Sequence, residues 1–467
     1  MRSPNDRILP LVVACPLFLQ NLDTSVMTTA LPVMSTALRV PVLDLNLAIT
    51  AYLLSLAVFL PVSGWLADRF GAKRVFCAAI VLFALGSALC GSANTLPQLV
   101  LFRIVQGVGG AMMVPVGRLI LLRSVPANEM MRAMVWFTIP PVIGRLLGPL
   151  AGGVIVSVTS WQWIFLVNIP FGLLGLALAL RYVDADPPAA EAARPQPFDL
   201  LGFLLLACGL SGVLCAVETA GKALVPAAVT WTVGLAGAAA LGGYLRHSRR
   251  RAEPLIDLGI LRHPTYRASV LGGTPLRIAL GAAPFLLPLL LQLGFGLTPL
   301  QSGLLTMATA IGSLGTRAVV VRAIRRFGFR TLLMGSTLLA ALFMAGYGLF
   351  TPATPHPLMF GVMVLGGLFS AMALVSLATL GYSEIPPQRM SHATALTNIA
   401  QQLSISAGVV MGASLLTLAS VARGGQAHAL QASDFNIAFL VIGALTLISA
   451  AAFSRLRDEH GEALRGR

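Results

Sequence analysis

Fourteen long apolar stretches alternate with short polar segments along the chain. An α-helix needs about 20 apolar residues to cross a hydrocarbon core of roughly 30 Å. Because lipid offers the backbone no hydrogen-bond partners, we expect these stretches to be helices. The pattern therefore predicts an all-α polytopic membrane protein. The predicted spans are 8–30, 45–66, 75–95, 97–121, 131–157, 161–181, 199–218, 224–245, 267–292, 300–322, 331–350, 357–383, 391–419 and 434–455.

Composition supports a membrane protein and argues against a globular enzyme. Hydrophobic residues make up 57% of the chain and charged residues 10%, and the mean hydropathy is +0.84. Soluble domains carry about 25% charged residues. The loops between the spans are short, which also disfavours a membrane receptor with a sizeable soluble domain.

The basic residues are distributed as in an inner-membrane protein rather than a nucleic-acid binder. The net charge is +15. Outside the spans, nearly all Lys and Arg residues fall in alternate loops and the two tails, which places both termini in the cytoplasm. The exceptions on the opposite side are Arg39, Lys222 and Arg423, and five arginines lie within spans: Arg103, Arg118, Arg145, Arg277 and Arg317. We expect no nucleic-acid partner.

Residues that hold metals or cofactors show no suitable spacing. The five cysteines all fall within predicted spans and form no CxxC pair, so they are expected to pack as small apolar residues. The six histidines have no ligand spacing, and the chain has no phosphate-binding motif that could support ATP-driven pumping. We therefore expect no metal, no cofactor and no catalytic residue, and do not expect an enzyme.

A short repeat divides the chain. Arg69-Phe70-Gly71 follows the second span and Arg326-Phe327-Gly328 follows the tenth, each trailed by a basic residue. The eight-span offset predicts two six-helix bundles with one inserted helix pair. The predicted divisions are an N-terminal bundle (8–181), proline-containing linkers with the inserted pair (182–266), a C-terminal bundle (267–455) and a cytoplasmic tail (456–467). The run 249–251 in the second linker (RRR) is interpreted as an orientation signal or an anionic-lipid contact.

The segment 64–74 (GWLADRFGAKR) is the most distinctive motif. Gly64 permits close helix approach, and Gly71 permits a tight turn. Asp68, Arg69 and Arg74 can pair with neighbouring helices and hold one face of the protein closed.

A buried acid and a buried arginine lie at similar depths in two other spans. Asp23 in the segment 22–32 (LDTSVMTTALP) costs about 2.5–3.5 kcal/mol within a membrane. Gln20, Thr24 and Thr28 line one side of that helix. Arg103 and Gln106 belong to the segment 103–110 (RIVQGVGG). The acid either takes part in proton or substrate coupling or forms a structural ion pair with Arg103, which would make it a poor proton carrier.

The fifth span carries a glycine ridge. Gly144, Gly148 and Gly152 recur every four residues, and Pro149 can bend the helix.

In these four motifs the chain resembles the major facilitator superfamily, specifically its 14-helix branch of drug:proton antiporters and the MdtD-like multidrug exporters within it. The resemblance implies that the 64–74 loop is a conformational latch, that Arg103 takes part in proton transfer, and that the fifth-span motif is a hinge and seal typical of exporters. It also implies a location in the bacterial cytoplasmic membrane. The segment 161–171 (WQWIFLVNIPF) resembles a further motif, for which we expect a membrane-anchoring role.

Two residues depart from the family pattern. Pro141 stands where relatives usually have glycine, and Arg145 where they have a small residue or proline. Arg145 either faces the central cavity or breaks a packing surface. Arg277, deep in the ninth span, is a binding-site candidate. Glu218 ends its span on the outer side, where we expect it to be solvated.

Together these features predict a proton-coupled exporter of small organic molecules that works by alternating access. Three deep arginines against one deep acid favour anionic, zwitterionic or neutral substrates, either drugs or carboxylates. The alternative is an importer or facilitator of an anionic metabolite. The expected partners are the substrate, protons and lipid, with accessory efflux proteins as a further option, and the expected state is a monomer.

Overall fold

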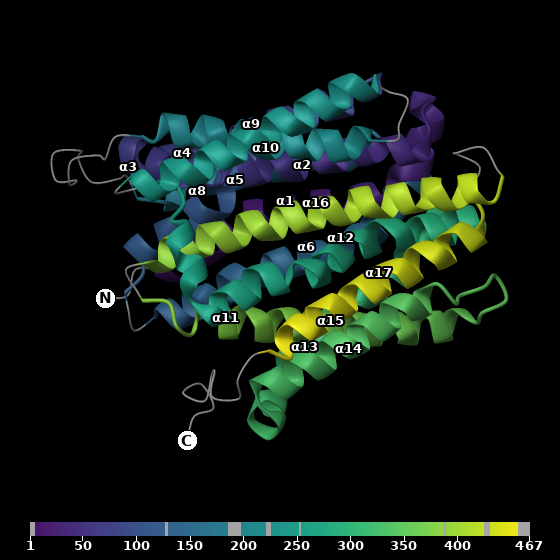
Figure 1. Cartoon of the computed structure of the whole chain (residues 1–467). Coiled ribbons are helices and arrows are strands. Elements are labelled where there is room, and N and C mark those ends of the chain that lie inside the picture. Colours follow the sequence, from purple (N-terminus) through teal and green to yellow (C-terminus); the bar gives the residue numbers. More distant parts are fainter. Residues whose placement is uncertain are drawn as a thin grey trace. The chain divides into compact units, whose positions relative to one another are not determined.

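A computed structural model describes residues 5–126, 129–184, 198–220, 226–251, 254–386, 389–424 and 430–455. The described residues are almost entirely helical and include no strand (Figure 1). Fourteen helices or helix combinations are long and apolar enough to cross a membrane, which confirms the all-α, 14-span prediction. Most of the predicted linker 182–198, Lys222 and the whole tail 456–467 lie outside the described residues.

The helices follow the predicted order along the chain. They are α1 (Asn5–Leu38), α2 (Asn46–Phe59), α3 (Val62–Phe70), α4 (Ala72–Gly91), α5 (Leu96–Ser124), α6 (Met130–Val158), α7 (Trp163–Leu166), α8 (Asn168–Tyr182), α9 (Leu200–Thr219), α10 (Ala227–Arg250), α11 (Pro264–Arg267), α12 (Thr274–Leu289), α13 (Pro299–Phe327), α14 (Phe329–Tyr347), α15 (His356–Tyr382), α16 (Met390–Ala422) and α17 (Ala432–Phe453). Two short 3-10 helices, η1 (Val42–Leu45) and η2 (Leu258–Arg262), lie between them.

The chain divides into two compact units. Unit 1 comprises Met1–Met27, Leu47–Gly148 and Val158–Ile256, and unit 2 comprises Thr28–Asn46, Pro149–Ser157 and Asp257–Arg467. Helices α1 and α6 therefore contribute residues to both units.

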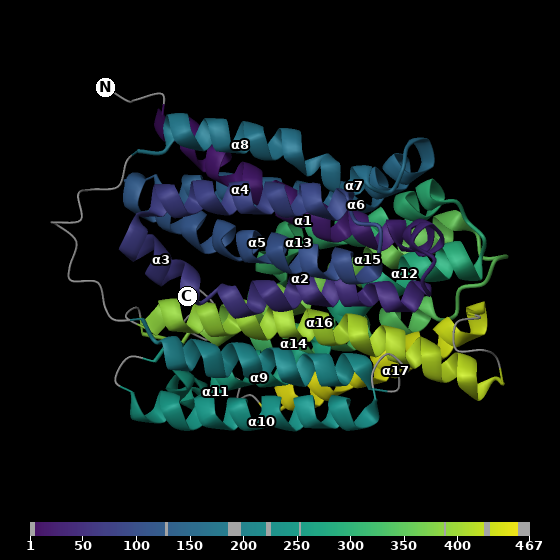
Figure 2. The same cartoon turned by 90° about the horizontal axis from the view of Figure 1, so that it is seen from above.

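In unit 1, α4 packs along α5 and α8, and the inserted helices α9 and α10 form a hairpin (Figure 2). Glycines let the two hairpin helices approach closely, since a Cβ added at Gly212 would lie 2.9 Å from the Cα atom of Gly237. Aromatic rings join α9 to the second span. The ring of Phe198 lies 4.7 Å from that of Trp65, and the ring of Phe203 lies 5.7 Å from that of Phe59.

In unit 2, α13 packs along α15, α14 along α17, and α12 along α16. One apolar cluster joins α14, α15 and α17 through the buried side chains Phe329, Leu333, Leu377, Leu380 and Phe453. The crossing of α12 and α16 depends on glycine, because a Cβ at Gly281 would overlap the backbone of Ile405.

Three predicted spans are interrupted, and the one over 161–181 is interrupted only at Val167, between α7 and α8. The span predicted as one helix over 45–66 breaks at Leu60 and Pro61, because proline lacks the N–H that would continue the helix ladder. The span predicted over 267–292 contains α12 between two π-helical turns, η3 (Ala268–Gly272) and η4 (Leu290–Gly294). Such turns leave backbone carbonyls out of the regular ladder.

The repeated Arg-Phe-Gly segments adopt the same geometry. Gly71 has φ +92° and Gly328 has φ +79°, and each ends one helix and begins the next. Lys73, two residues after Gly71, donates to the Leu180 and Val183 carbonyls at the end of α8. Arg330, two residues after Gly328, donates to the Ser454 carbonyl at the end of α17. The repeat seen in sequence is therefore also a repeat of contacts.

Candidate functional site: a buried ion-pair network

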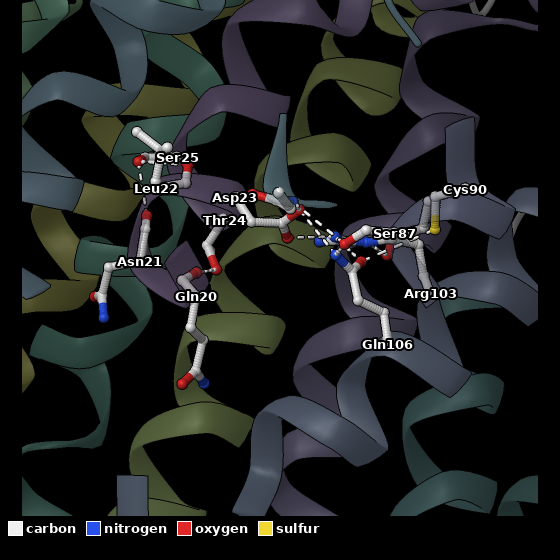
Figure 3. Close-up of polar contacts among 12 residues, drawn as sticks. Gln20, Asn21, Leu22, Asp23, Thr24, Ser25, Ser87, Cys90, Arg103 and Gln106 are labelled. Carbon is white, nitrogen blue, oxygen red and sulfur yellow. Dashed lines mark hydrogen bonds and ion pairs between the residues drawn. The ribbon is translucent and has the colours of Figure 1, made fainter. Parts of the chain in front are cut away.

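Asp23 and Arg103 form a buried ion pair in unit 1. Asp23 on α1 is 2% exposed and Arg103 on α5 is fully buried. Arg103 Nη1 donates to Asp23 Oδ2 at 2.6 Å. Figure 3 shows the carboxylate turned toward α5, whereas Asn21 and Ser25 project from another side of α1. The similar depths of the two residues in sequence thus correspond to direct contact.

Gln106 joins the ion pair from the same face of α5 as Arg103, because residues three apart on a helix are neighbours. Its Nε2 atom donates to Asp23 Oδ1 at 2.9 Å and to Ser87 Oγ at 2.7 Å. Its Oε1 atom accepts from Arg103 Nη1 at 2.6 Å. Asp23, Arg103 and Gln106 therefore lie together in one network (Figure 3).

Sequence reasoning missed two members of this network. Asn168, at the start of α8, donates through Nδ2 to Asp23 Oδ1 at 2.8 Å and to Ser87 Oγ at 3.3 Å. Asn168 and Ser87 on α4 are both fully buried. Asn168 lies in the 161–171 motif, for which we expected only an anchoring role. The available signal was an amide in the middle of an apolar span, which needs a buried partner.

The network pairs both charged groups. Asp23 accepts hydrogen bonds from Arg103, Gln106 and Asn168, so both of its carboxylate oxygens have partners. Arg103 also donates through Nε to the Ala48 carbonyl at 3.3 Å, and its guanidinium carbon lies 4.1 Å from the centre of the Tyr52 ring. The pair is closed to solvent in this conformation, so a proton or a ligand can reach Asp23 only if these contacts rearrange.

Glycines on α5 allow this close assembly. A Cβ at Gly107 would lie 2.6 Å from the Ser55 Cβ atom, and one at Gly110 would lie 3.1 Å from the Tyr52 hydroxyl. The absence of a side chain at these two glycines brings α5 close against α2.

The 64–74 loop contains one exposed ion pair. Asp68 Oδ1 lies 2.8 Å from Arg123 Nη2 at the end of α5, with the two side chains 61% and 45% exposed. Arg69 and Arg74 are exposed. The tight turn expected at Gly71 is present, whereas the close approach expected at Gly64 is wrong, because a Cβ there would meet nothing within 4 Å.

The glycines of α6 pack as the motif suggests. In unit 1, a Cβ at Gly144 would lie 2.5 Å from the Phe18 carbonyl oxygen, and one at Gly148 would overlap the Ser25 hydroxyl. In unit 2, Gly152 is buried and the Pro149 carbonyl lies directly against Gly303 of α13.

Arg145 does not disrupt this surface. It is more than one-third exposed, and its Nη2 atom donates to Asn21 Oδ1 at 3.3 Å. No carboxylate of the described residues forms an ion pair with Arg145. The expectation that Arg145 breaks the packing surface of α6 is therefore wrong.

Arg277 is a second fully enclosed arginine, 1% exposed, on α12 of unit 2. Its Nη1 atom donates to the carbonyls of Ser269 at 2.8 Å and Val270 at 3.3 Å, both in the π-helical turn η3. Its Nε atom has no hydrogen-bond partner among the described residues, and no carboxylate there forms an ion pair with it.

Two smaller expectations need correction. Glu218 is 3% exposed instead of solvated. Trp161 is 4% exposed and packs edge-on against Phe165, so only Trp163, 52% exposed, has the exposure expected of an interfacial anchor. Within the described part of the chain, no group of three or more metal-ligating side chains comes together.

The chain matches known transporters along almost its whole length. The sequence profile of the Major Facilitator Superfamily matches residues 13–409 and, in a second match, residues 270–466. A protein of Klebsiella pneumoniae subsp. pneumoniae named "Putative multidrug resistance protein MdtD" is 40% identical over 465 residues, which cover 96% of this chain and 94% of the relative. The protein of the same name from Yersinia enterocolitica is 36% identical over 455 residues, covering 96% and 95%.

Solved structures share the fold at low sequence identity. The D-xylose-proton symporter has a TM-score of 0.68 at 16% identity, with 97% of this chain and 98% of that chain covered. The POT family transporter PepTSo has a TM-score of 0.68 at 13% identity, with 97% of this chain and 99% of that chain covered. With 14 apolar helices and these relatives, the chain is an integral membrane protein that belongs to the major facilitator superfamily of transporters.

Proposed function

We propose that this protein is a proton-coupled secondary transporter that exports small organic molecules, of the multidrug or organic-anion type, by alternating access. We place it in the bacterial cytoplasmic membrane as a monomer, with both termini in the cytoplasm. Asp23, Arg103 and Gln106 are the proposed coupling residues, and Arg145 and Arg277 are the proposed substrate-contacting residues. The 64–74 loop is the proposed latch, and the α6 glycines with Pro149 form the proposed hinge.

The buried Asp23–Arg103 pair carries this proposal. Ionisable residues inside a membrane protein are costly and usually functional. Asp23 accepts from three donors, and Arg103 is its counter-charge. In a coupled cycle, a proton that binds Asp23 replaces the charge of Arg103 as the carboxylate's partner. The Arg103 guanidinium can then bind another anion or move to another position.

The charge inventory supports anionic or neutral substrates over permanent cations. Asp23 compensates Arg103, whereas neither Arg145 nor Arg277 has a carboxylate partner among the described residues. A permanent cation would add to this uncompensated positive charge. Export is supported by the α6 glycine surface and by the relatives' name, which describes them as multidrug resistance proteins.

One observation favours the alternative of an importer or facilitator. Arg145 stands within the α6 motif at a position that is small or proline in the exporters that the chain resembles. Its exposed guanidinium could admit an anionic metabolite in either direction. Coupling to a proton gradient distinguishes these two possibilities.

The test uses everted membrane vesicles acidified by respiration, with acridine orange reporting the lumenal pH. Salicylate, ethidium and chloramphenicol serve as anionic, cationic and neutral probes. Proton-coupled export predicts that at least one probe releases protons from the lumen. Loss of this response in Asp23→Asn, with the protein still present in the membrane, supports Asp23 as the coupling residue.

Matched variants separate coupling from folding. Asp23→Glu keeps the charge and should retain part of the response. Asp23→Asn/Arg103→Gln removes both charges, so it should restore stability without restoring proton release. A response to ethidium alone would contradict the substrate proposal, and no response to any probe would favour the facilitator.

A further inference from the structure

The C-terminal parts of α1 and α6 pack within unit 2. The segments Thr28–Asn46 and Pro149–Ser157 belong to this unit, together with α12, η4 and α13. In sequence the two segments are part of the predicted N-terminal bundle, whereas α12, η4 and α13 are part of the C-terminal bundle. With the termini proposed to be cytoplasmic, α1, α6 and α12 all run outward. Contacts of these segments with η4 and α13 therefore lie on the outer side, and we call them the outer closure.

Two kinds of contact make up the outer closure. Between α6 and α13 the backbones pack directly at glycine, since a Cβ at Gly153 would lie 2.6 Å from the Pro299 carbonyl oxygen. Between α1 and η4 a side chain forms a hydrogen bond, because Gln292 Nε2 donates to the Thr29 carbonyl oxygen at 3.0 Å. This hydrogen bond is lost once the two segments separate by about 1 Å. It is therefore sensitive to whether the outer side is closed or open.

Gln292 is a buried amide among apolar side chains. It is 9% exposed, and the preceding residues Leu290 and Leu291 are fully buried. Its second contact, to Ser302 Oγ, is 3.5 Å long, which is at the limit for a hydrogen bond. The Thr29 carbonyl is therefore the main partner of the Gln292 Nε2 atom. Because a buried amide without a partner is costly, the amide favours the conformation in which α1 contacts η4.

The hydroxyl of Thr29 has the opposite effect. Thr29 is fully buried, and its Oγ1 atom has no hydrogen-bond partner among the described residues. An unpaired buried hydroxyl disfavours the closed conformation, and water could pair with it once the outer side opens. One hydrogen bond made by Gln292 and one left unmade by Thr29 bring the closed and open states closer in free energy. Such a balance suits a closure that must open in every transport cycle.

We propose that Gln292 is a positioning residue for alternating access, because its amide holds α1 against η4 and thereby sets how often the outer side opens. The inference rests on the proposed alternating access, and it requires neither proton coupling nor a particular substrate. A hydrogen bond between neutral groups shifts an equilibrium by about twofold to tenfold. Loss of the Gln292 amide should raise the open fraction by this factor.

Thiol modification at position 29 measures opening of the outer closure even when the open state is rare. Thr29→Cys is introduced into a chain whose five cysteines are replaced by alanine. Right-side-out membrane vesicles are then treated with the charged, membrane-impermeant thiol reagent MTSET. The rate of modification follows the fraction of open molecules. Gln292→Met keeps the size of the side chain and removes the donor, so it should raise this rate by about twofold to tenfold.

Two controls separate this role from a general effect on packing. Ser302→Ala removes the longer contact of Gln292 and should leave the rate at Thr29→Cys unchanged. Thr337 is also fully buried in unit 2, on α14. Thr337→Cys therefore reports loosening of the whole unit, and Gln292→Met should not change its rate.

Three results would overturn the role of Gln292. The first is an equal rate at Thr29→Cys with and without Gln292→Met. The second is an equal rise at Thr29→Cys and Thr337→Cys, which would indicate general loosening. The third is a rise of the same size with Ser302→Ala, which would assign the effect to the contact between η4 and α13.

Failure of the proposed function gives different results. Modification of Thr29→Cys only in everted vesicles would contradict the proposed orientation and, with it, an outer closure. No modification from either side would show that this closure does not open, which would contradict both alternating access here and the role of Gln292. Absence of proton movement with every probe would remove the proposed coupling but leave the thiol measurement to decide the role of Gln292.

Discussion

The two units each enclose one arginine, and the contrast between them is informative. Arg103 in unit 1 and Arg277 in unit 2 are both at most 1% exposed. Arg103 donates hydrogen bonds to a carboxylate, an amide and a carbonyl, whereas the hydrogen bonds of Arg277 within the described part of the chain go to two carbonyls. The degree of burial alone therefore does not show whether a charged side chain has a compensating partner. The first belongs to a nearly neutral network, and the second adds net positive charge to its surroundings.

The repeated turns differ in the same way. Both units place a glycine of positive φ between two helices, followed by a basic residue that binds a helix end. Asp68 precedes Gly71 by three residues and pairs with Arg123. The position three residues before Gly328 is Arg325. The backbone geometry is thus common to both units, while the acid belongs to unit 1 alone.

The largest effect should come from removing Arg103. Arg103→Gln leaves the Asp23 carboxyl group buried without its counter-charge, and breaking such a pair costs about 3–5 kcal/mol. We expect a large fall in melting temperature in detergent. The double variant Asp23→Asn/Arg103→Gln should recover most of the loss. Equal instability of the single and double variants would show that the contacts of Arg103 to Ala48 and Tyr52 matter more than its charge.

Asp199 extends the comparison to a carboxylate outside the spans. It caps α9 and binds His247 at 2.8 Å and Arg251 at 3.2 Å. Burial raises the pKa of Asp199, but hydrogen bonds from His247 and the backbone N–H groups of Gly202 and Leu255 outweigh it, so the pKa is lowered overall. Asp199→Asn should cost about 1–3 kcal/mol, because a charged acceptor is lost while the cap is kept.

The difference in stability between the wild type and Asp199→Asn should depend on pH in a definite direction. Because the folded pKa is lowered, the stabilisation is fully present above the unfolded pKa of about 3.9 and is lost as the pH falls through the folded value. The gap in melting temperature between wild type and Asp199→Asn should stay constant from neutral pH down to about 5 and close only below about 4. A gap that closes above about pH 5 would show that ionisation of the Asp199 carboxylate does not set the difference.

Arg277 should respond in the opposite direction to Arg103. Arg277→Gln removes an uncompensated buried charge and keeps a donor for the two carbonyls of η3. We expect a stability equal to the wild type or about 1 kcal/mol higher, together with weaker transport of the anionic probe. Thermal melting and salicylate exchange measure the two effects. A loss of more than about 2 kcal/mol would mean that Arg277 is as well compensated as Arg103.

The smallest change in stability is expected at the turns. The Asp68–Arg123 pair is exposed, so Asp68→Asn should change stability by less than about 1 kcal/mol. If this pair is a latch, Asp68→Asn should still slow transport. Arg325→Gln, at the corresponding position in unit 2, should alter neither. Equal transport rates in both variants and the wild type would rule out a latch at Asp68.

Sequence patterns predicted the helices well because apolar length is a one-dimensional property. They also predicted that Asp23 and Arg103 could meet, since depth in a span can be counted in residues. They did not reveal Asn168 or Ser87, because contact between helices depends on rotation about each axis and on which helices are neighbours. The break at Pro61 was missed because the apolar run continues through it. The contact of Arg145 with Asn21 was not predicted for the same reason.

The most direct test of the central claim is proton movement by purified protein in pyranine-loaded proteoliposomes, measured for the wild type and Asp23→Asn with the probe that responds in vesicles. The account predicts that the wild type moves protons with substrate, and that Asp23→Asn exchanges labelled for unlabelled substrate but moves no protons. Proton movement by Asp23→Asn at the wild-type rate would contradict it and assign coupling to another residue.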